Sequence, residues 1–193
     1  MAAQVSTHIT LLQRLQAGDD SRAWDDFSQR YSLLIRAVAS RHGLQPADAD
    51  DILQDVLLAL TKSLVTFVYD PQRARFRTYL QVIVQRSIFR KFRQNQTTRS
   101  ITELAQGESD KDYCDGIWES EWRQYHMHLA MKSIEVEFNE RDRNAFSMYF
   151  GAQMPAAMTA DTLGMSLDQV YQAKSRIIRR IGELIAQQVS EEG

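Results

Sequence analysis

The chain has 193 residues, of which 44% are hydrophobic and 25% charged, a balance typical of a folded globular protein and not of a disordered one. Its 8 glycines and 3 prolines amount to about half the average usage, which disfavours a turn-rich all-β fold. The single cysteine, Cys114, excludes an internal disulfide framework, and no apolar run is long enough to cross a membrane, so the composition predicts a cytoplasmic protein.

The formal net charge of −2 conceals two segments of opposite sign. Residues 71–99 contain eight basic residues and no acidic one, whereas residues 100–121 contain seven acidic residues and one lysine. A basic stretch attracts nucleic acid and an acidic stretch repels it, so the signs of the segments matter more here than the total.

Four amphipathic helices are predicted in the first half of the chain. Asp20 or Ser21 can cap the second of them, Gly43 ends it, and Pro46 opens the third. A connector at residues 67–74 precedes the fourth helix, and the four are short enough to share one core. The predicted helices cover residues 9–16, 21–42, 46–64 and 76–92.

The second half of the chain begins with a polar, acidic stretch at residues 94–116, whose weak periodicity predicts a linker. Helical spacing then resumes, with Asn139 as a cap and Pro155 as the start of a short helix. The predicted helices cover residues 118–138, 140–151, 155–163 and 167–188. The chain is therefore predicted to be all-α, with helical domains at residues 8–95 and 118–189 joined by an acidic linker at residues 96–117.

Residues 155–170 are typical of a helix-turn-helix. Gly164 permits a turn, and Ser166 with Gln169 forms a capping box for the second helix. The alternative interpretation is a helical hairpin with a solvated basic face. The exposed side of the second helix offers groups that can contact base edges and phosphates, namely Gln169, Gln172, Lys174, Ser175, Arg176, Arg179 and Arg180.

Arginines alternate with aromatic residues at the start of the fourth predicted helix, where Arg75, Phe76, Arg77 and Tyr79 follow one another closely. Aromatic rings stack on unpaired bases while guanidinium groups follow the backbone, so this stretch suits exposed nucleic acid. Helical spacing also puts Tyr79 on one face with three arginines, at positions 86, 90 and 93. In the alternative interpretation Phe76 and Tyr79 belong to the core and the arginines only solvate it.

Asp51, Gln54 and Asp55 form a second polar patch, on the helix before this stretch. Carboxylates beside a basic face repel DNA, so the patch is predicted to meet a basic protein partner. An ordinary solvated first turn is the alternative.

These segments resemble sigma-70 family RNA polymerase sigma factors. Asp48-Ala-Asp-Asp-Ile-Leu-Gln-Asp-Val-Leu-Leu-Ala-Leu60 looks like their region 2.2 helix, and residues 76–93 are similar to regions 2.3 and 2.4. The predicted helix-turn-helix corresponds to region 4, and the two-module plan resembles the extracytoplasmic-function (ECF) group.

The resemblance implies a partner for each patch. It implies that Asp51, Gln54 and Asp55 contact the clamp helices of the polymerase β′ subunit, with the β flap as a further contact of the chain. For recognition and melting of the −10 element it implies Arg75, Phe76, Arg77, Tyr79, Gln85, Arg86 and Arg90. For the major groove of the −35 element it implies Gln169, Gln172, Lys174, Ser175, Arg176 and Arg179. It implies no catalytic residue, metal, cofactor or membrane contact, and it leaves open whether an anti-sigma factor binds.

Two other functions compete with this interpretation. A freestanding helix-turn-helix regulator would explain residues 155–170, but it gives no task to Asp51 or to the aromatic and basic stretch. An enzyme has little support, because His126 and His128 diverge on a helix and Cys114 has no nearby base.

The acidic linker itself has two interpretations. A solvated spacer is the simpler and favoured one. The alternative is that acids such as Glu108, Asp110, Asp112 and Asp115 shield the basic stretch in the free protein.

Overall fold

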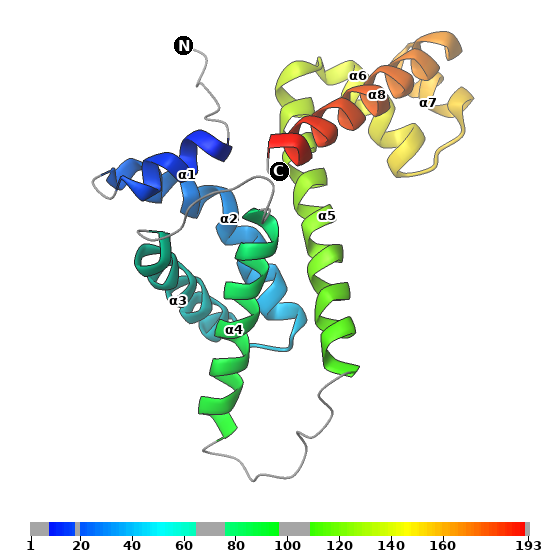
Figure 1. Cartoon of the computed structure of the whole chain (residues 1–193). Helices are drawn as coiled ribbons and strands as arrows, with labels where there is room; N and C mark the ends of the chain where they lie inside the picture. The colour runs from blue at the N-terminus through cyan, green and yellow to red at the C-terminus, as the bar shows by residue number, and fades with distance from the viewer. Residues whose placement is uncertain (1–7, 18–19, 65–75, 97–108, 192–193) are drawn as a thin grey trace. The chain divides into compact units, whose positions relative to one another are not determined.

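The computed structural model describes residues 8–17, 20–64, 76–96 and 109–191, and they form an all-α protein (Figure 1). The chain divides into two compact units, and the boundary between Arg123 and Gln124 falls inside one helix. Among the described helices, none combines the length and the apolar character that a membrane crossing requires. The all-α prediction is therefore confirmed.

Unit 1 contains α1 (His8–Gln16), α2 (Ser21–Arg41), α3 (Pro46–Leu64) and α4 (Phe76–Gln96). The predicted cap of α2 is confirmed, because the Asp20 carboxylate accepts a hydrogen bond of 3.1 Å from the Ala23 amide. The fourth helix runs past its predicted end at Phe92 to Gln96. The predicted connector at residues 67–74 lies outside the described residues.

The core of unit 1 lies where α3 packs against both α2 and α4. Phe27 and Tyr31 of α2 are fully buried, with ring centroids 4.8 Å apart, and the Phe76 ring of α4 lies 6.2 Å and 5.7 Å from them. These separations suit edge-to-face and tilted ring packing. Apolar residues at intervals of three and four complete the core, namely Ile52, Val56 and Leu60 of α3 and Leu80, Val84 and Ile88 of α4.

The helix that the sequence predicted to begin at Trp118 begins earlier, so α5 covers Ser109–Glu137. Residues 109–117, predicted to be linker, are helical, and residues 97–108 lie outside the described residues. The physical reason is a buried stripe that the acidic composition masks: Cys114, Ile117, Trp118 and Trp122 are all nearly inaccessible to solvent. Cys114 is therefore a core residue of a helix and not part of a linker.

The part of α5 up to Arg123 belongs to unit 1, and unit 2 begins at Gln124. Unit 2 also contains α6 (Glu140–Phe146), a π-helical turn η1 (Ser147–Gly151), α7 (Ala156–Leu163) and α8 (Leu167–Glu191). The predicted Asn139 cap is confirmed, because the Asp142 amide donates a hydrogen bond of 2.9 Å to Asn139 Oδ1. The single helix predicted at residues 140–151 is instead an α-helix followed by the π-helical turn. The core of the unit consists of Ala130, Ile134, Phe146, Ile177, Ile181 and Leu184.

The predicted helix-turn-helix is present, formed by α7 and α8. Gly164 follows α7 with φ of 59° and ψ of 40°, a left-handed conformation that glycine adopts without strain. The Ser166 amide donates to Gln169 Oε1 at 2.9 Å, and the Gln169 amide donates to Ser166 Oγ at 3.2 Å. This reciprocal pair confirms the predicted capping box.

Candidate nucleic-acid and partner interfaces

One face of α4 belongs to the core of unit 1. Phe76 lies on it with 0% of its surface exposed. A ring without exposed surface cannot stack on a base, so the prediction that Phe76 contacts DNA does not fit this structure, and the core interpretation does. Arg75, the neighbouring candidate, lies outside the described residues.

A second face of α4, with polar residues at intervals of four, contacts α5. Gln81 and Gln85 donate hydrogen bonds to the Asp115 carboxylate at 2.7 Å and 3.3 Å. The Arg77 guanidinium donates to Glu119, which lowers the pKa of that carboxyl, and lies 5.2 Å from the centroid of the Trp122 ring. Two of the predicted −10 residues, Arg77 and Gln85, therefore have partners on α5.

A third face of α4 carries Tyr79, Arg86 and Arg90, which line a cavity of about 270 Å³ with residues of α3. The Tyr79 hydroxyl shares a hydrogen bond with Ser63 Oγ at its wall. Arg86 is exposed to solvent. The predicted common face is confirmed for Tyr79, Arg86 and Arg90, whereas Arg93, which was predicted to share it, does not line this cavity.

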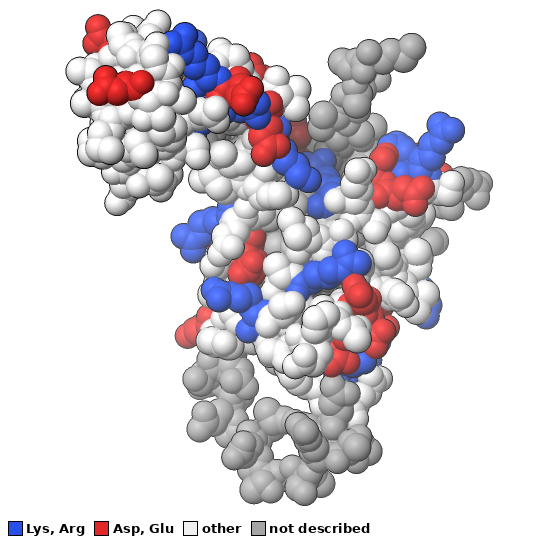
Figure 2. Space-filling model, turned by 180° about the vertical axis from the view of Figure 1, so that it is seen from behind, with Lys and Arg blue, Asp and Glu red and all other residues white. Residues whose placement is uncertain are grey.

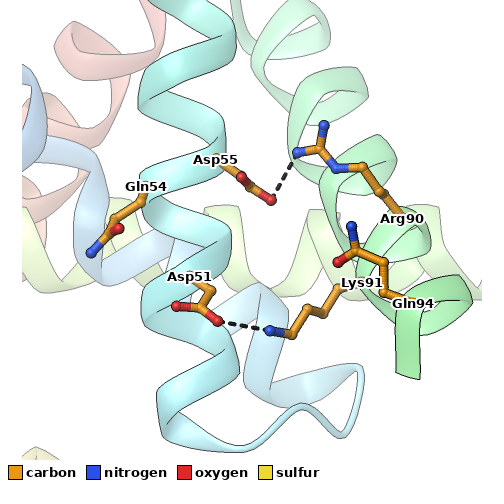
Figure 3. Close-up of a pocket in the computed structure, with 6 residues that line it drawn as sticks. All are labelled: Asp51, Gln54, Asp55, Arg90, Lys91 and Gln94. Atoms are coloured by element: carbon orange, nitrogen blue, oxygen red, sulfur yellow. Dashed lines mark hydrogen bonds and ion pairs between the residues drawn. The ribbon is translucent and has the colours of Figure 1, made fainter. Parts of the chain in front are cut away.

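The predicted partner patch lies across a charged groove from α4. Asp51, Gln54 and Asp55 of α3 line a cavity of about 380 Å³ together with Arg90, Lys91 and Gln94 of α4. Figure 3 shows Asp55 turned towards Arg90 and Asp51 towards Lys91. The two ion pairs measure 2.8 Å and 2.7 Å. Residues predicted to meet protein and residues predicted to meet DNA are therefore neighbours.

Lys91 is the residue that the sequence analysis missed in this groove. Its ammonium group bonds to Asp51 at 2.7 Å and to Asp48 at 2.9 Å, and these hydrogen bonds raise the pKa of Lys91. Only 17% of its side chain is exposed, whereas 60% of the Asp51 side chain is. The exposed carboxylate remains accessible to a partner, because a surface pair of this kind contributes only about 0–1 kcal/mol.

Basic and acidic side chains are neighbours on one face of the molecule. On the face of the molecule shown in Figure 2, Lys and Arg side chains lie beside Asp and Glu side chains.

The predicted −35 residues on α8 divide into two groups. Gln172, Ser175 and Arg179 are exposed, with Arg179 3.9 Å from Glu183 and 75% of its side chain accessible. Gln169 and Arg176 are exposed as well, but they bond to other parts of unit 2: Gln169 in the capping box, and Arg176 with Asp142 at 3.0 Å.

Lys174 belongs to an aromatic cluster that the sequence analysis did not foresee. Its ammonium group lies 5.2 Å from the centroid of Tyr149 and 5.7 Å from that of Phe150. Tyr149 also meets Tyr171 of α8, with ring centroids 5.6 Å apart, and Tyr171 is exposed. Tyr171 therefore lies beside Gln172 on the same helix as an additional residue that can contact DNA.

Arg179→Ala should weaken binding of duplex promoter DNA and lower the slope of log affinity against log salt by about one unit, since one phosphate contact is lost. Fluorescence anisotropy over a salt series measures both. Lys132→Ala is the matched control, because it removes an exposed cation of unit 2 from α5 and should leave the slope unchanged. An unchanged slope for Arg179→Ala would show that Arg179 faces away from the DNA.

The histidines and the cysteine that the sequence offered for chemistry do not converge. His126 is buried and shares a 2.9 Å hydrogen bond with Gln188, whereas His128 is exposed. Within the described ranges, no group of three or more His, Cys, Asp or Glu residues is placed to hold a metal ion.

Comparison with known families gives a match to part of the chain. Residues 27–98 match the family model for Sigma-70 region 2. The region 2 match covers most of α2, all of α3 and all of α4, and so includes the charged groove and the three faces of α4. A comparison with curated proteins gave no match.

Two solved structures are similar to the chain at low identity. One is the structure of CnrH in complex with the cytosolic domain of CnrY, with a TM-score of 0.37, 18% identity, and coverage of 92% of this chain and 96% of that chain. The other is the RsbN–BldN complex, with a TM-score of 0.37, 16% identity, and coverage of 90% of this chain and 98% of that chain.

Proposed function

We propose that the chain is a sigma factor of the ECF type, which binds core RNA polymerase and directs initiation at specific promoters. The observation that carries the proposal is the match of residues 27–98 to Sigma-70 region 2, on the helices that form the charged groove. A helix-turn-helix in unit 2 supplies the second DNA-binding element that such a protein needs. The chain itself would catalyse nothing, since nucleotide addition belongs to the polymerase.

The polymerase contact is assigned to α3. Asp51, Gln54 and Asp55 would meet the β′ clamp helices, and unit 2 would meet the β flap. The support is electrostatic: the Asp51 carboxylate is exposed and that of Asp55 is partly exposed, and their present partners are single cations, which a basic protein surface can replace.

The −10 contact is assigned to α4. Tyr79, Arg86 and Arg90 share a face in which a ring can stack on an unpaired base while cations hold phosphates. Binding of flipped bases offsets the unstacking cost of a few kcal/mol per step. Arg75, Arg77 and Gln85 remain proposed contacts, whereas Phe76 acts by holding α4 in the core.

The −35 contact is assigned to α8, whose amino-terminal part would lie in the major groove. Gln172, Ser175 and Arg179 are exposed and would reach the DNA directly. Gln169, Lys174 and Arg176 are held by neighbours in unit 2, and they would contact the backbone or orient the helix. An anti-sigma partner stays a prediction of the family resemblance, and a cytoplasmic site of action follows from the proposed role.

Transcription of sheared genomic DNA by purified core polymerase tests the proposal, with and without the chain, followed by sequencing of RNA 5′ ends. We expect new start sites that share −10 and −35 motifs and that require the chain. A freestanding regulator predicts sequence-specific duplex binding in the absence of polymerase and no new start sites. That result would refute the sigma-factor role.

A further inference from the structure

We propose that the amino-terminal part of α5, residues 111–123, occupies part of the DNA surface of α4, so that this helix and DNA compete for the same side chains. The inference rests on the proposed function of α4 in DNA binding. It concerns contacts within unit 1 only.

The contacts are specific and regularly spaced. Asp115 accepts from Gln81 at 2.7 Å and from Gln85 at 3.3 Å, while Glu119, one turn further along α5, accepts from Arg77. Residues four apart on each helix therefore meet in register. An acidic side of α5 covers one polar face of α4.

The chemistry of these contacts matches what DNA would offer. A guanidinium and two amides on α4 are donors, and α5 gives them carboxylate oxygens as acceptors. Phosphate oxygens and base edges are acceptors for the same donors. Arg77 also lies over the Trp122 ring, and a guanidinium group can stack on the face of a base in the same way. The acidic helix therefore imitates a nucleic acid at this face.

The covering helix can leave without loss of the main core. The face of α4 that packs in unit 1, through Phe76, Leu80 and Val84, is distinct from the face that meets α5. The hydrogen bonds to α5 are exposed or half-exposed and are easily exchanged. Release also exposes the buried side chains of Ile117, Trp118 and Trp122, so the covered state predominates in the free chain and DNA binding must offset that loss.

Variants of the full chain in which carboxylates are replaced by neutral amides test the competition. In Asp115→Asn with Glu119→Gln the contacts are weakened, whereas Asp25→Asn with Asp112→Asn removes the same net charge from exposed positions for which no contact with α4 is seen. The probe is a labelled thymidine 20-mer, and its affinity is measured by anisotropy at low salt. If the covered state predominates, freeing α4 should raise affinity by about the reciprocal of the open fraction, on the order of tenfold, and the control pair should raise it by much less.

Tryptophan emission gives a readout that does not depend on net charge. Trp118 and Trp122 of α5 are buried while α5 covers α4. Release of α5 by saturating oligonucleotide exposes them to water, so in a Trp24→Phe background the tryptophan emission should shift to the red. Equal affinities of the two variant pairs, or binding without a red shift, would overturn the competition. If either of these results is obtained but Arg86→Ala with Arg90→Ala abolishes oligonucleotide binding, only the competition is wrong and the DNA-binding role of α4 stands. If that variant binds as tightly as the parent, both the role of α4 and the competition are wrong.

Discussion

Phe76→Ala should lower the free energy of unfolding of unit 1 by about 3–5 kcal/mol, the usual cost of removing a large buried ring. The ring has no exposed surface and packs against Phe27 and Tyr31, so the truncation leaves a cavity that two other aromatic rings must border. Urea denaturation of the full chain, followed by circular dichroism, measures the loss.

Phe89→Ala is the matched control for this variant. Phe89 lies on the same helix with 41% of its surface exposed, so the loss should stay well below that of Phe76→Ala. The pair separates the two interpretations that the sequence left open for Phe76. A variant that kept its stability and lost only −10 recognition would restore Phe76 as a DNA contact.

Replacing Asp51 and Asp55 together by lysine should weaken binding of the chain to core polymerase by at least about tenfold. Both changes put a cation where the proposed basic partner docks. They also place new charge beside Lys91 and Arg90, which adds repulsion inside the groove. Competition with a labelled parent chain for core polymerase measures the affinity.

The folding cost of these two substitutions should be modest, because each pair they break has at least one partner half or more exposed, and surface pairs contribute about 0–1 kcal/mol each. Asp50→Lys is the control on the same helix, since Asp50 is exposed and pairs with Arg36 of α2 instead of facing the groove. If Asp50→Lys weakened core binding as much as the double change, the docking surface would lie on another side of α3.

The ends of the helices could be predicted from the sequence where contacts between neighbouring residues determine them. Asp20, Asn139, Gly164 and the Ser166–Gln169 pair mark helix ends through bonds within a few residues, so their roles could be predicted. The start of α5 could not, because its acidic composition resembles a linker and its helical state depends on burying Trp118 and its neighbours. Burial of that kind is a tertiary effect that composition does not reveal.

The candidate sites were predicted only in part for a similar reason. Helical spacing correctly grouped Tyr79 with Arg86 and Arg90 on one face. It could not show that Lys91 bridges to Asp48 and Asp51, or that Asp115 meets Gln81, because these pairs depend on how two helices are aligned along each other. The spacing of Asp115, Glu119 and Trp122 on one side of α5 was the available signal.

The turn between α7 and α8 has a thermodynamic consequence. Gly164 already holds its left-handed conformation, and Ser166 and Gln169 already satisfy each other's amides, so the backbone is fixed before any duplex is met. Little chain entropy then remains to be lost on docking, and the ordering cost falls on long exposed side chains such as Arg179 and Gln172. A fixed backbone with adaptable exposed side chains would allow α8 to bind related −35 sequences by changing side-chain rotamers alone.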